Sequence, residues 1–258
     1  MVQYFDEISP SLGKWIERQH VFWVATAPLS GDGHVNVSPK GGEGMFHIVN
    51  PRQVWYEDLT GSGVETVSHL RENGRITVMF NAFEGPPRIL RLYGRGTVYE
   101  FSTPEFNALV PPESRKPGTR AIILVDVHKV GTSCGYAVPF FDFKSHRNRL
   151  LTWAAKKEAL DVNSDAHTGF SALVDGLKRY WATKNLKSLD GLTGLTCAPY
   201  AEDGFAVNKE AIAYKPDNEK VKNQRAYFTG ALVQGGMNIM IGFSLGVAAA
   251  SFYLRKSH

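Results

Sequence analysis

The fold is decided by the run Val21-Phe22-Trp23-Val24-Ala25-Thr26-Ala27, the turn Gly31-Asp32-Gly33 and the alternating run His34-Val35-Asn36-Val37-Ser38. A short apolar run, a glycine-rich turn and a period of two are typical of β-strands joined by a tight connection. The same signature recurs along the next hundred residues. Further strands are expected at Met45–Val49, Val54–Asp58, Ile76–Phe83, Ile89–Glu100 and Ala121–Val130.

Short breaks separate these runs, among them Asn50-Pro51, Gly85-Pro86-Pro87 and Pro111-Pro112. Many strands joined by tight turns indicate an antiparallel barrel or sandwich rather than a doubly wound sheet. Few helices are expected among them. They are Phe5–Gln19, Val64–Glu72 and one that follows Thr103-Pro104, where a capping residue precedes proline.

The pattern changes after Pro139, where Asn148–Leu160 and Phe170–Asn185 show helical spacing. We therefore divide the chain into four parts. They are a barrel domain (1–145), a helical extension (146–215), a polar linker (216–225) and a hydrophobic helix (226–254).

No residue from Ala226 to Leu254 is charged, and this run is long enough to cross a membrane, which needs roughly 20 apolar residues. The alternative is a buried helix of a soluble protein. More basic residues precede the run than follow it, which favours a domain that faces the cytosol and is tail-anchored. Without the anchor, the chain would be cytoplasmic.

The composition is that of an ordinary folded protein, with a net charge of +4 and a pI near 9.0. Lysines and arginines do not cluster with aromatic residues, so no nucleic-acid partner is expected. The two cysteines, Cys134 and Cys197, lie far apart, which argues against a zinc site and a disulfide scaffold. The histidines show no metal-binding spacing.

Three motifs could carry chemistry. In Ser38-Pro39-Lys40-Gly41-Gly42 a hydroxyl, a cation and glycine amides can converge on an anion, although a plain turn explains the same residues. In Thr60-Gly61-Ser62-Gly63-Val64-Glu65-Thr66, Ser62 and Glu65 have the spacing of a capping box. Free amides at such a helix start could also meet a phosphate or a flavin carbonyl.

The third motif is Arg88-Ile89-Leu90-Arg91-Leu92-Tyr93-Gly94-Arg95, in which Arg91, Tyr93 and Arg95 share one face of a strand. An arginine there could grip a phosphate or form a surface ion pair. A rival motif, Gly131-Thr132-Ser133-Cys134-Gly135, matches a serine-hydrolase elbow but lacks the helix that must follow it. A Rossmann loop at residues 61–66 is disfavoured because Thr66 replaces the third glycine.

Taken in order, the three motifs resemble those of the pyridoxamine-phosphate-oxidase-like family over roughly residues 15–140. The resemblance implies a six-stranded antiparallel split β-barrel of Greek-key type that forms a homodimer with flavin mononucleotide (FMN) at the interface. It also implies the roles of individual residues. Ser38, Pro39, Lys40 and Gly41 would lie on the phosphate side, Thr60, Gly61, Ser62, Gly63 and Thr66 would lie near the ring or ribityl chain, and Arg91 would contact the phosphate or the interface.

The chain departs from the vitamin B6 oxidases in lacking their arginine- and proline-rich C-terminal segment, so oxidation of pyridoxamine phosphate is not expected. The expected function is an FMN-dependent oxidoreductase that acts on an unidentified small molecule. No acid or base stands out as catalytic. The alternative is a non-enzymatic flavin- or ligand-binding dimer on the same barrel.

Overall fold

The computed structural model describes residues 2–165, 175–202 and 204–205 of the chain. Eight strands of these residues form one antiparallel sheet. They are β1 (Gln3–Phe5), β2 (Val21–Thr26), β3 (Asn36–Gly41), β4 (Phe46–Asn50), β5 (Gln53–Leu59), β6 (Arg75–Asn81), β7 (Ile89–Glu100) and β8 (Thr119–Ser133).

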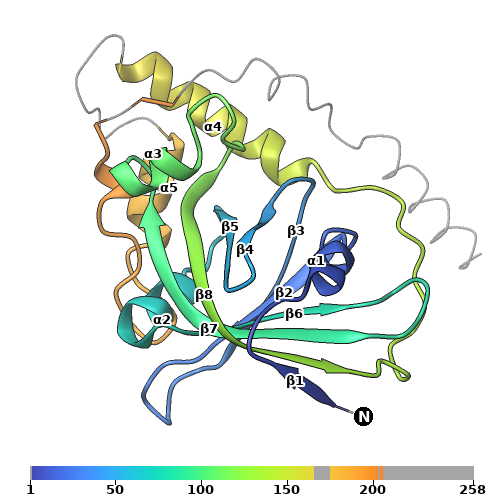
Figure 1. Cartoon of the computed structure of the whole chain (residues 1–258). Coiled ribbons are helices and arrows are strands. Elements are labelled where there is room, and N and C mark those ends of the chain that lie inside the picture. The colour runs from blue at the N-terminus through green and yellow to red at the C-terminus, as the bar shows by residue number, and fades with distance from the viewer. Residues whose placement is uncertain (1, 166–174, 203, 206–258) are drawn as a thin grey trace, which may run out of the picture. The chain divides into compact units, whose positions relative to one another are not determined.

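The strand order is β3-β2-β6-β7-β8-β5-β4, and β1 pairs with the second half of β8. The long strands β7 and β8 bend along their length, so that the sheet curls around its buried face (Figure 1). The predicted class, mainly β and antiparallel with a few helices, is confirmed. The six strands implied by the resemblance differ from the eight found here. The seven runs expected from the pattern correspond to β2–β8, and the additional strand β1 is too short to show a period.

The helices of the described residues lie around this sheet. They are α1 (Pro10–Ile16), α2 (Glu65–Asn73), α3 (Pro104–Leu109), α4 (Arg149–Asp165), α5 (Leu177–Lys184) and a short 3-10 turn at Ala198–Tyr200. The expected cap of α3 is confirmed, since the Thr103 hydroxyl accepts a hydrogen bond from the Phe106 amide. The first helix begins at Pro10 rather than Phe5, because Ser9 caps it.

The capping box expected at Ser62 and Glu65 is wrong. Val64 occupies the cap position of α2, and no side chain caps it. Glu65 is instead the first helical residue, and its carboxylate accepts a hydrogen bond from the Leu189 amide at 3.3 Å. The Glu65 side chain, which the local spacing assigned to capping the helix, is therefore engaged in a tertiary contact instead.

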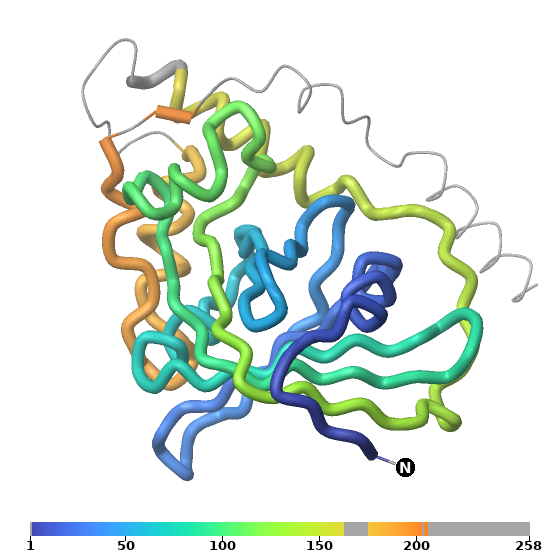
Figure 2. The backbone as a smooth tube through the Cα atoms, viewed as in Figure 1, coloured from blue at the N-terminus to red at the C-terminus, as the bar shows by residue number. Residues whose placement is uncertain are grey.

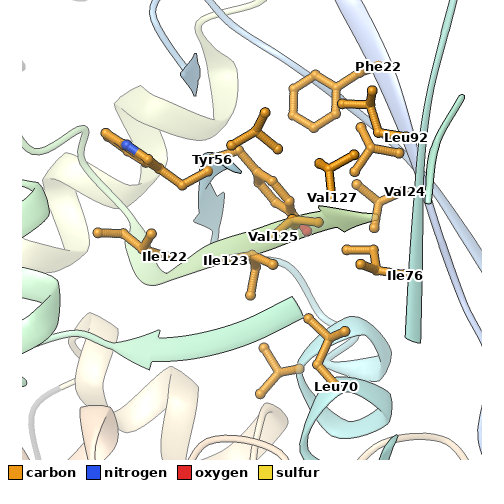
Figure 3. Packing of buried hydrophobic residues seen from close by; sticks show 14 of the residues in the cluster. Phe22, Val24, Tyr56, Leu70, Ile76, Leu92, Ile122, Ile123, Val125 and Val127 are labelled. Carbon is orange, nitrogen blue, oxygen red and sulfur yellow. The ribbon is translucent and has the colours of Figure 1, made fainter. Parts of the chain in front are cut away.

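The core lies on the inner face of the curled sheet (Figure 3). Val24, Leu92 and Val125 are fully buried there, and Phe22 packs edge-on against Tyr56 with ring centroids 5.3 Å apart. The Tyr56 hydroxyl has no hydrogen-bond partner among the described residues. Its burial raises the pKa of this phenol well above the usual value.

The segment after α5, orange in Figure 2, passes beside α2, where the Arg71 Nε donates to the Gly194 carbonyl at 2.9 Å. One buried carboxylate, that of Glu100 at the end of β7, fixes this segment. Glu100 accepts hydrogen bonds from the amides of Thr196, Cys197 and Ala198 at 2.8–2.9 Å. It also accepts from the Thr196 hydroxyl and from Arg71 of α2. Burial raises the pKa of Glu100, but these donors outweigh it and lower the pKa below its usual value.

The predicted linker (216–225) and hydrophobic helix (226–254) lie outside the described residues, and the membrane anchor stays a prediction. Within residues 2–165, 175–202 and 204–205, no helix combines the length and the apolar character that a membrane crossing requires.

Replacing Glu100 by Gln should destabilise the fold by about 3 kcal/mol, because an amide nitrogen then faces backbone donors and Arg71 loses its charged partner. The matched control is Glu105→Gln on the exposed side of α3. Urea unfolding measures the stability, and limited proteolysis reports whether residues 185–205 are released. Equal stability of the two variants would contradict this role of Glu100.

Candidate functional site

Strand β3 carries two of the predicted ligands on its core-facing side. Ser38 pairs with Val24 of β2, and Lys40 pairs with Phe22, and both partners are buried. Directly paired residues share a face of the sheet. Ser38 and Lys40 are themselves only partly covered, because β3 is the end strand of the row.

Lys40 and Arg120 converge on a single buried carboxylate, that of Asp58. The Lys40 Nζ donates to Asp58 Oδ1 at 2.7 Å, and the Arg120 Nε donates to Asp58 Oδ2 at 2.9 Å. Asp58 is fully buried, and the Lys40 side chain keeps 22% of its surface exposed. Two cations share one anion, so the cluster carries an excess positive charge with lysine on its accessible side.

The charges in this cluster fix the state of Asp58. Burial by itself raises the pKa of the carboxyl, but the charges and hydrogen bonds of Lys40 and Arg120 outweigh it and lower the pKa to about 2. Asp58 is therefore ionised at neutral pH.

The glycine loop is held from the outside. The Thr60 hydroxyl donates to the Gly118 carbonyl at 2.7 Å and accepts from the Trp181 Nε1 at 2.8 Å. Asn185 donates to the Gly61 carbonyl at 3.0 Å, and Arg120 reaches the same carbonyl at 3.3 Å. Thr60 is thus a buried anchor of the loop, and Ser62 and Gly63 form its exposed part.

A negative charge already lies beneath this exposed part. A Cβ atom on Gly63 would meet the Glu65 Oε2 at 2.2 Å, so this carboxylate lies directly against the loop at the start of α2. An anionic ligand placed over Gly63 would meet that charge at short range. The loop is therefore suited to a neutral part of a ligand, and the anionic part is better placed at Lys40.

Thr66 belongs to a second polar cluster. The side-chain Nδ2 of Asn36 donates to the Thr66 hydroxyl at 3.0 Å, and the Ser38 hydroxyl donates to the side-chain Oδ1 of Asn36 at 3.0 Å. Thr66 is 5% exposed and lies in the first turn of α2. The structure thus links Ser38 and Thr66 through Asn36, a residue that the sequence analysis left out.

Arg91 lies on the opposite face of the sheet. It continues a row of directly paired residues that runs through Pro39 of β3, Trp23 of β2 and Met79 of β6. Pro39 therefore shares the outer face with Arg91, whereas Ser38 and Lys40 face inward. Within one protomer, the structure does not bring Arg91 to the Lys40 cluster.

The close approach of two strands accounts for glycine at position 41. A Cβ atom at this position would lie 2.8 Å from the His20 carbonyl oxygen, so only glycine lets β3 approach the start of β2 this closely. It ends the strand that presents Ser38 and Lys40.

Four further residues of the site were missed by the sequence analysis: Asn36, Asp58, Arg120 and Asn185. A local signal existed for two of them. Asn36 alternates with Ser38 and Lys40 along β3, and Asp58 is a charged residue at the end of an apolar strand. Arg120 and Asn185 show no such pattern, because their partners are set by tertiary contact.

The rival elbow motif is excluded by the same description. Ser133 pairs with Ile89 at the end of β8, and a turn and irregular chain follow it instead of a helix. A nucleophile elbow requires a strand-to-helix turn.

Replacing Asp58 by Asn should leave Lys40 and the buried Arg120 unpaired and destabilise the fold by about 3–5 kcal/mol near neutral pH. The pKa of Asp58 is lower in the folded than in the unfolded chain. Ionisation of Asp58 therefore stabilises the wild type fully above about pH 4, and this contribution is lost as the pH falls toward 2. The stability gap between wild type and variant should shrink by about 2 kcal/mol over that range. Urea unfolding from about pH 5 to pH 2 measures it, and a gap independent of pH would contradict the assignment.

Comparison with known proteins bears on this arrangement of residues. A family model described as pyridoxamine 5'-phosphate oxidase matches residues 8–134. A curated relative from Aspergillus flavus, the pyridoxamine 5'-phosphate oxidase family protein ustO, is 38% identical over 200 residues, which cover 76% of this chain and 78% of that protein.

Solved structures with a similar fold are more distant in sequence. HupZ of Group A Streptococcus is 20% identical with a TM-score of 0.39, covering 48% of this chain and 91% of that chain. An FMN-binding protein from Syntrophomonas wolfei is 11% identical with a TM-score of 0.35, covering 45% and 78%. On the match with the family model and the curated relative, the chain belongs to the pyridoxamine 5'-phosphate oxidase family.

Proposed function

We propose that the chain binds FMN and acts as a flavin-dependent oxidoreductase on a small molecule. The observation that carries the proposal is the cluster of Lys40 and Arg120 on the single carboxylate of Asp58. It places an excess positive charge beside an exposed glycine loop, which together suit a phosphorylated, planar ligand.

The charge distribution suggests how FMN lies. Lys40 is the accessible cation and would take the phosphate as a point charge, while Arg120 stays buried on Asp58 and the Gly61 carbonyl. Glu65 beneath Gly63 disfavours the phosphate at that end of the loop, so Ser62 and Gly63 would face the uncharged part of the ligand.

The bound flavin would supply hydride transfer, and the residues of the chain would position it and limit its contact with water. Trp181 and Asn185 hold the glycine loop in place through Thr60 and Gly61. Asn185 also reaches the Ser62 carbonyl at 3.5 Å, while the side of the loop at Ser62 and Gly63 stays exposed and could meet a ligand. Preformed loops of this kind reduce the ordering cost of binding.

Replacing Lys40 by Ala should weaken FMN binding tenfold or more, because one charge-assisted hydrogen bond contributes about 1.5–3 kcal/mol. Riboflavin, which lacks the phosphate, should bind both proteins with nearly equal affinity. The control is Lys14→Ala, which removes an exposed lysine of α1. Fluorescence titration measures both flavins. An unchanged FMN affinity in the Lys40 variant would place the phosphate elsewhere.

The absorbance spectrum of the purified full chain decides between the candidate functions. Twin flavin bands and release of FMN on denaturation are expected, followed by bleaching with a reduced nicotinamide cofactor and recovery in air. Bound flavin that no nicotinamide cofactor reduces would favour a non-enzymatic binding dimer. A protein that neither contains FMN nor takes it up would refute the flavin proposal.

We further propose that the chain forms a homodimer through the outer face of the sheet. Val37 and Tyr4 lie on that face and are 60% and 62% exposed. Arg91 lies on the same face, so dimer formation would bring it toward the other protomer. Exposed apolar side chains on one sheet face are typical of an interaction surface.

Replacing Val37 by Glu should convert the dimer to a monomer, because the charge would have to be buried in the interface. Leu160→Glu on helix α4, also exposed, is the control and should remain dimeric. Sedimentation velocity measures the mass. A wild-type monomer at micromolar concentration, or a dimer of the Val37 variant, would contradict this interface.

A further inference from the structure

Asn36 lies on the core-facing side of β3, two residues before Ser38 and four before Lys40. Its carboxamide is the centre of a small polar network, and each end of the group has a different partner. The Oδ1 end accepts the Ser38 hydroxyl at 3.0 Å. The Nδ2 end donates to the Thr66 hydroxyl at 3.0 Å and, over a longer distance of 3.4 Å, to the Thr26 hydroxyl.

Both partners of the Nδ2 end are hydroxyl groups, which can accept its hydrogen bonds. Thr26 Oγ1 lies 3.0 Å from the Nδ1 of His69, a histidine with no exposed surface. Burial lowers the pKa of this imidazole, and its Nε2 has no hydrogen-bond partner among the described residues. The Thr26 and Thr66 hydroxyls both accept from the Asn36 Nδ2, which leaves the Oδ1 of the carboxamide for Ser38.

This direction determines what Ser38 can offer a ligand. A hydroxyl has one proton and two lone pairs. The Ser38 proton is committed to Asn36, so the side that remains is an acceptor. A phosphate group at neutral pH presents acceptor oxygens, so Ser38 could donate to it only by giving up its hydrogen bond to Asn36. The resemblance implies a phosphate-side role for Ser38, and that role would cost this hydrogen bond.

We propose that Ser38 accepts a hydrogen bond from the ring imide N3–H of the flavin, and that Asn36 is the positioning residue that turns the serine lone pairs toward it. This inference rests on the proposed flavin function. The imide N–H is the one N–H of the oxidised ring system, and it can only donate. Ribityl hydroxyls can donate or accept, so they do not require a serine whose proton is held elsewhere.

Three probes separate the possibilities: FMN, riboflavin and N3-methylriboflavin, which lacks the imide proton. N3-methylation should weaken binding to the wild type about five- to tenfold, the effect of one neutral hydrogen bond. In Ser38→Ala it should change the affinity less than about twofold, because the acceptor is gone. Ser38→Ala should also weaken FMN and riboflavin by the same factor, whereas Lys40→Ala should weaken FMN alone.

Two substitutions of Asn36 test its positioning role. Aspartate keeps an oxygen that accepts the Ser38 proton, so Asn36→Asp should keep the wild-type discrimination against N3-methylriboflavin. Alanine removes the acceptor of the Ser38 proton, so the hydroxyl is no longer held as an acceptor toward the ligand, although its lone pairs remain, and Asn36→Ala should reduce that discrimination. If Asn36 had only a structural role, both variants would be less stable, but they would show the same ratio of riboflavin affinity to N3-methylriboflavin affinity. Urea unfolding of each variant gives the stability for comparison.

The outcomes decide the inference separately from the proposed function. If the wild type binds FMN and Ser38→Ala weakens FMN but leaves riboflavin unchanged, Ser38 contacts the phosphate and the inference is overturned. Equal effects of N3-methylation on wild type and Ser38→Ala would also overturn it. A wild type that binds neither FMN nor riboflavin would refute the flavin proposal itself.

Discussion

The buried carboxylate of Asp58 ties together the parts on which the rest of the site depends. It comes from the end of β5 and binds Lys40 of β3 and Arg120 of β8, which are distant in the sequence. Arg120 in turn holds the Gly61 carbonyl, so the same charge cluster positions the glycine loop. A buried carboxylate without both partners would be costly, so the three elements keep one arrangement.

The C-terminal segment supports this arrangement from the other side. Trp181 and Asn185 contact the loop at Thr60 and Gly61, and Glu100 fixes the chain that follows them. The family model matches residues 8–134, so Trp181 and Asn185 lie outside the matched region. In this chain, the loop that the family motif supplies is held by residues that the motif does not contain.

The curled sheet gives the protein two faces with different chemistry. The inner face buries the aliphatic core and, at the open side of β3, presents Ser38 and Lys40. The outer face carries Pro39 and Arg91 in one row. Because neighbouring residues of a strand point to opposite faces, one motif of three residues serves both surfaces. This division explains why residues that are adjacent in the sequence need not share one ligand.

The sequence by itself determined the antiparallel strands, the cap at Thr103 and the two glycine-containing segments near Ser38 and Ser62, because period-two patterns and turn residues act locally. It misassigned Glu65, whose partner Leu189 lies 124 residues away. Only the tertiary structure decided that Asp58 binds Arg120, 62 residues away, and that Trp181 binds Thr60, 121 residues away. Strand register and the return of the C-terminal segment create those contacts, and neither is set by the residues next to them in the chain.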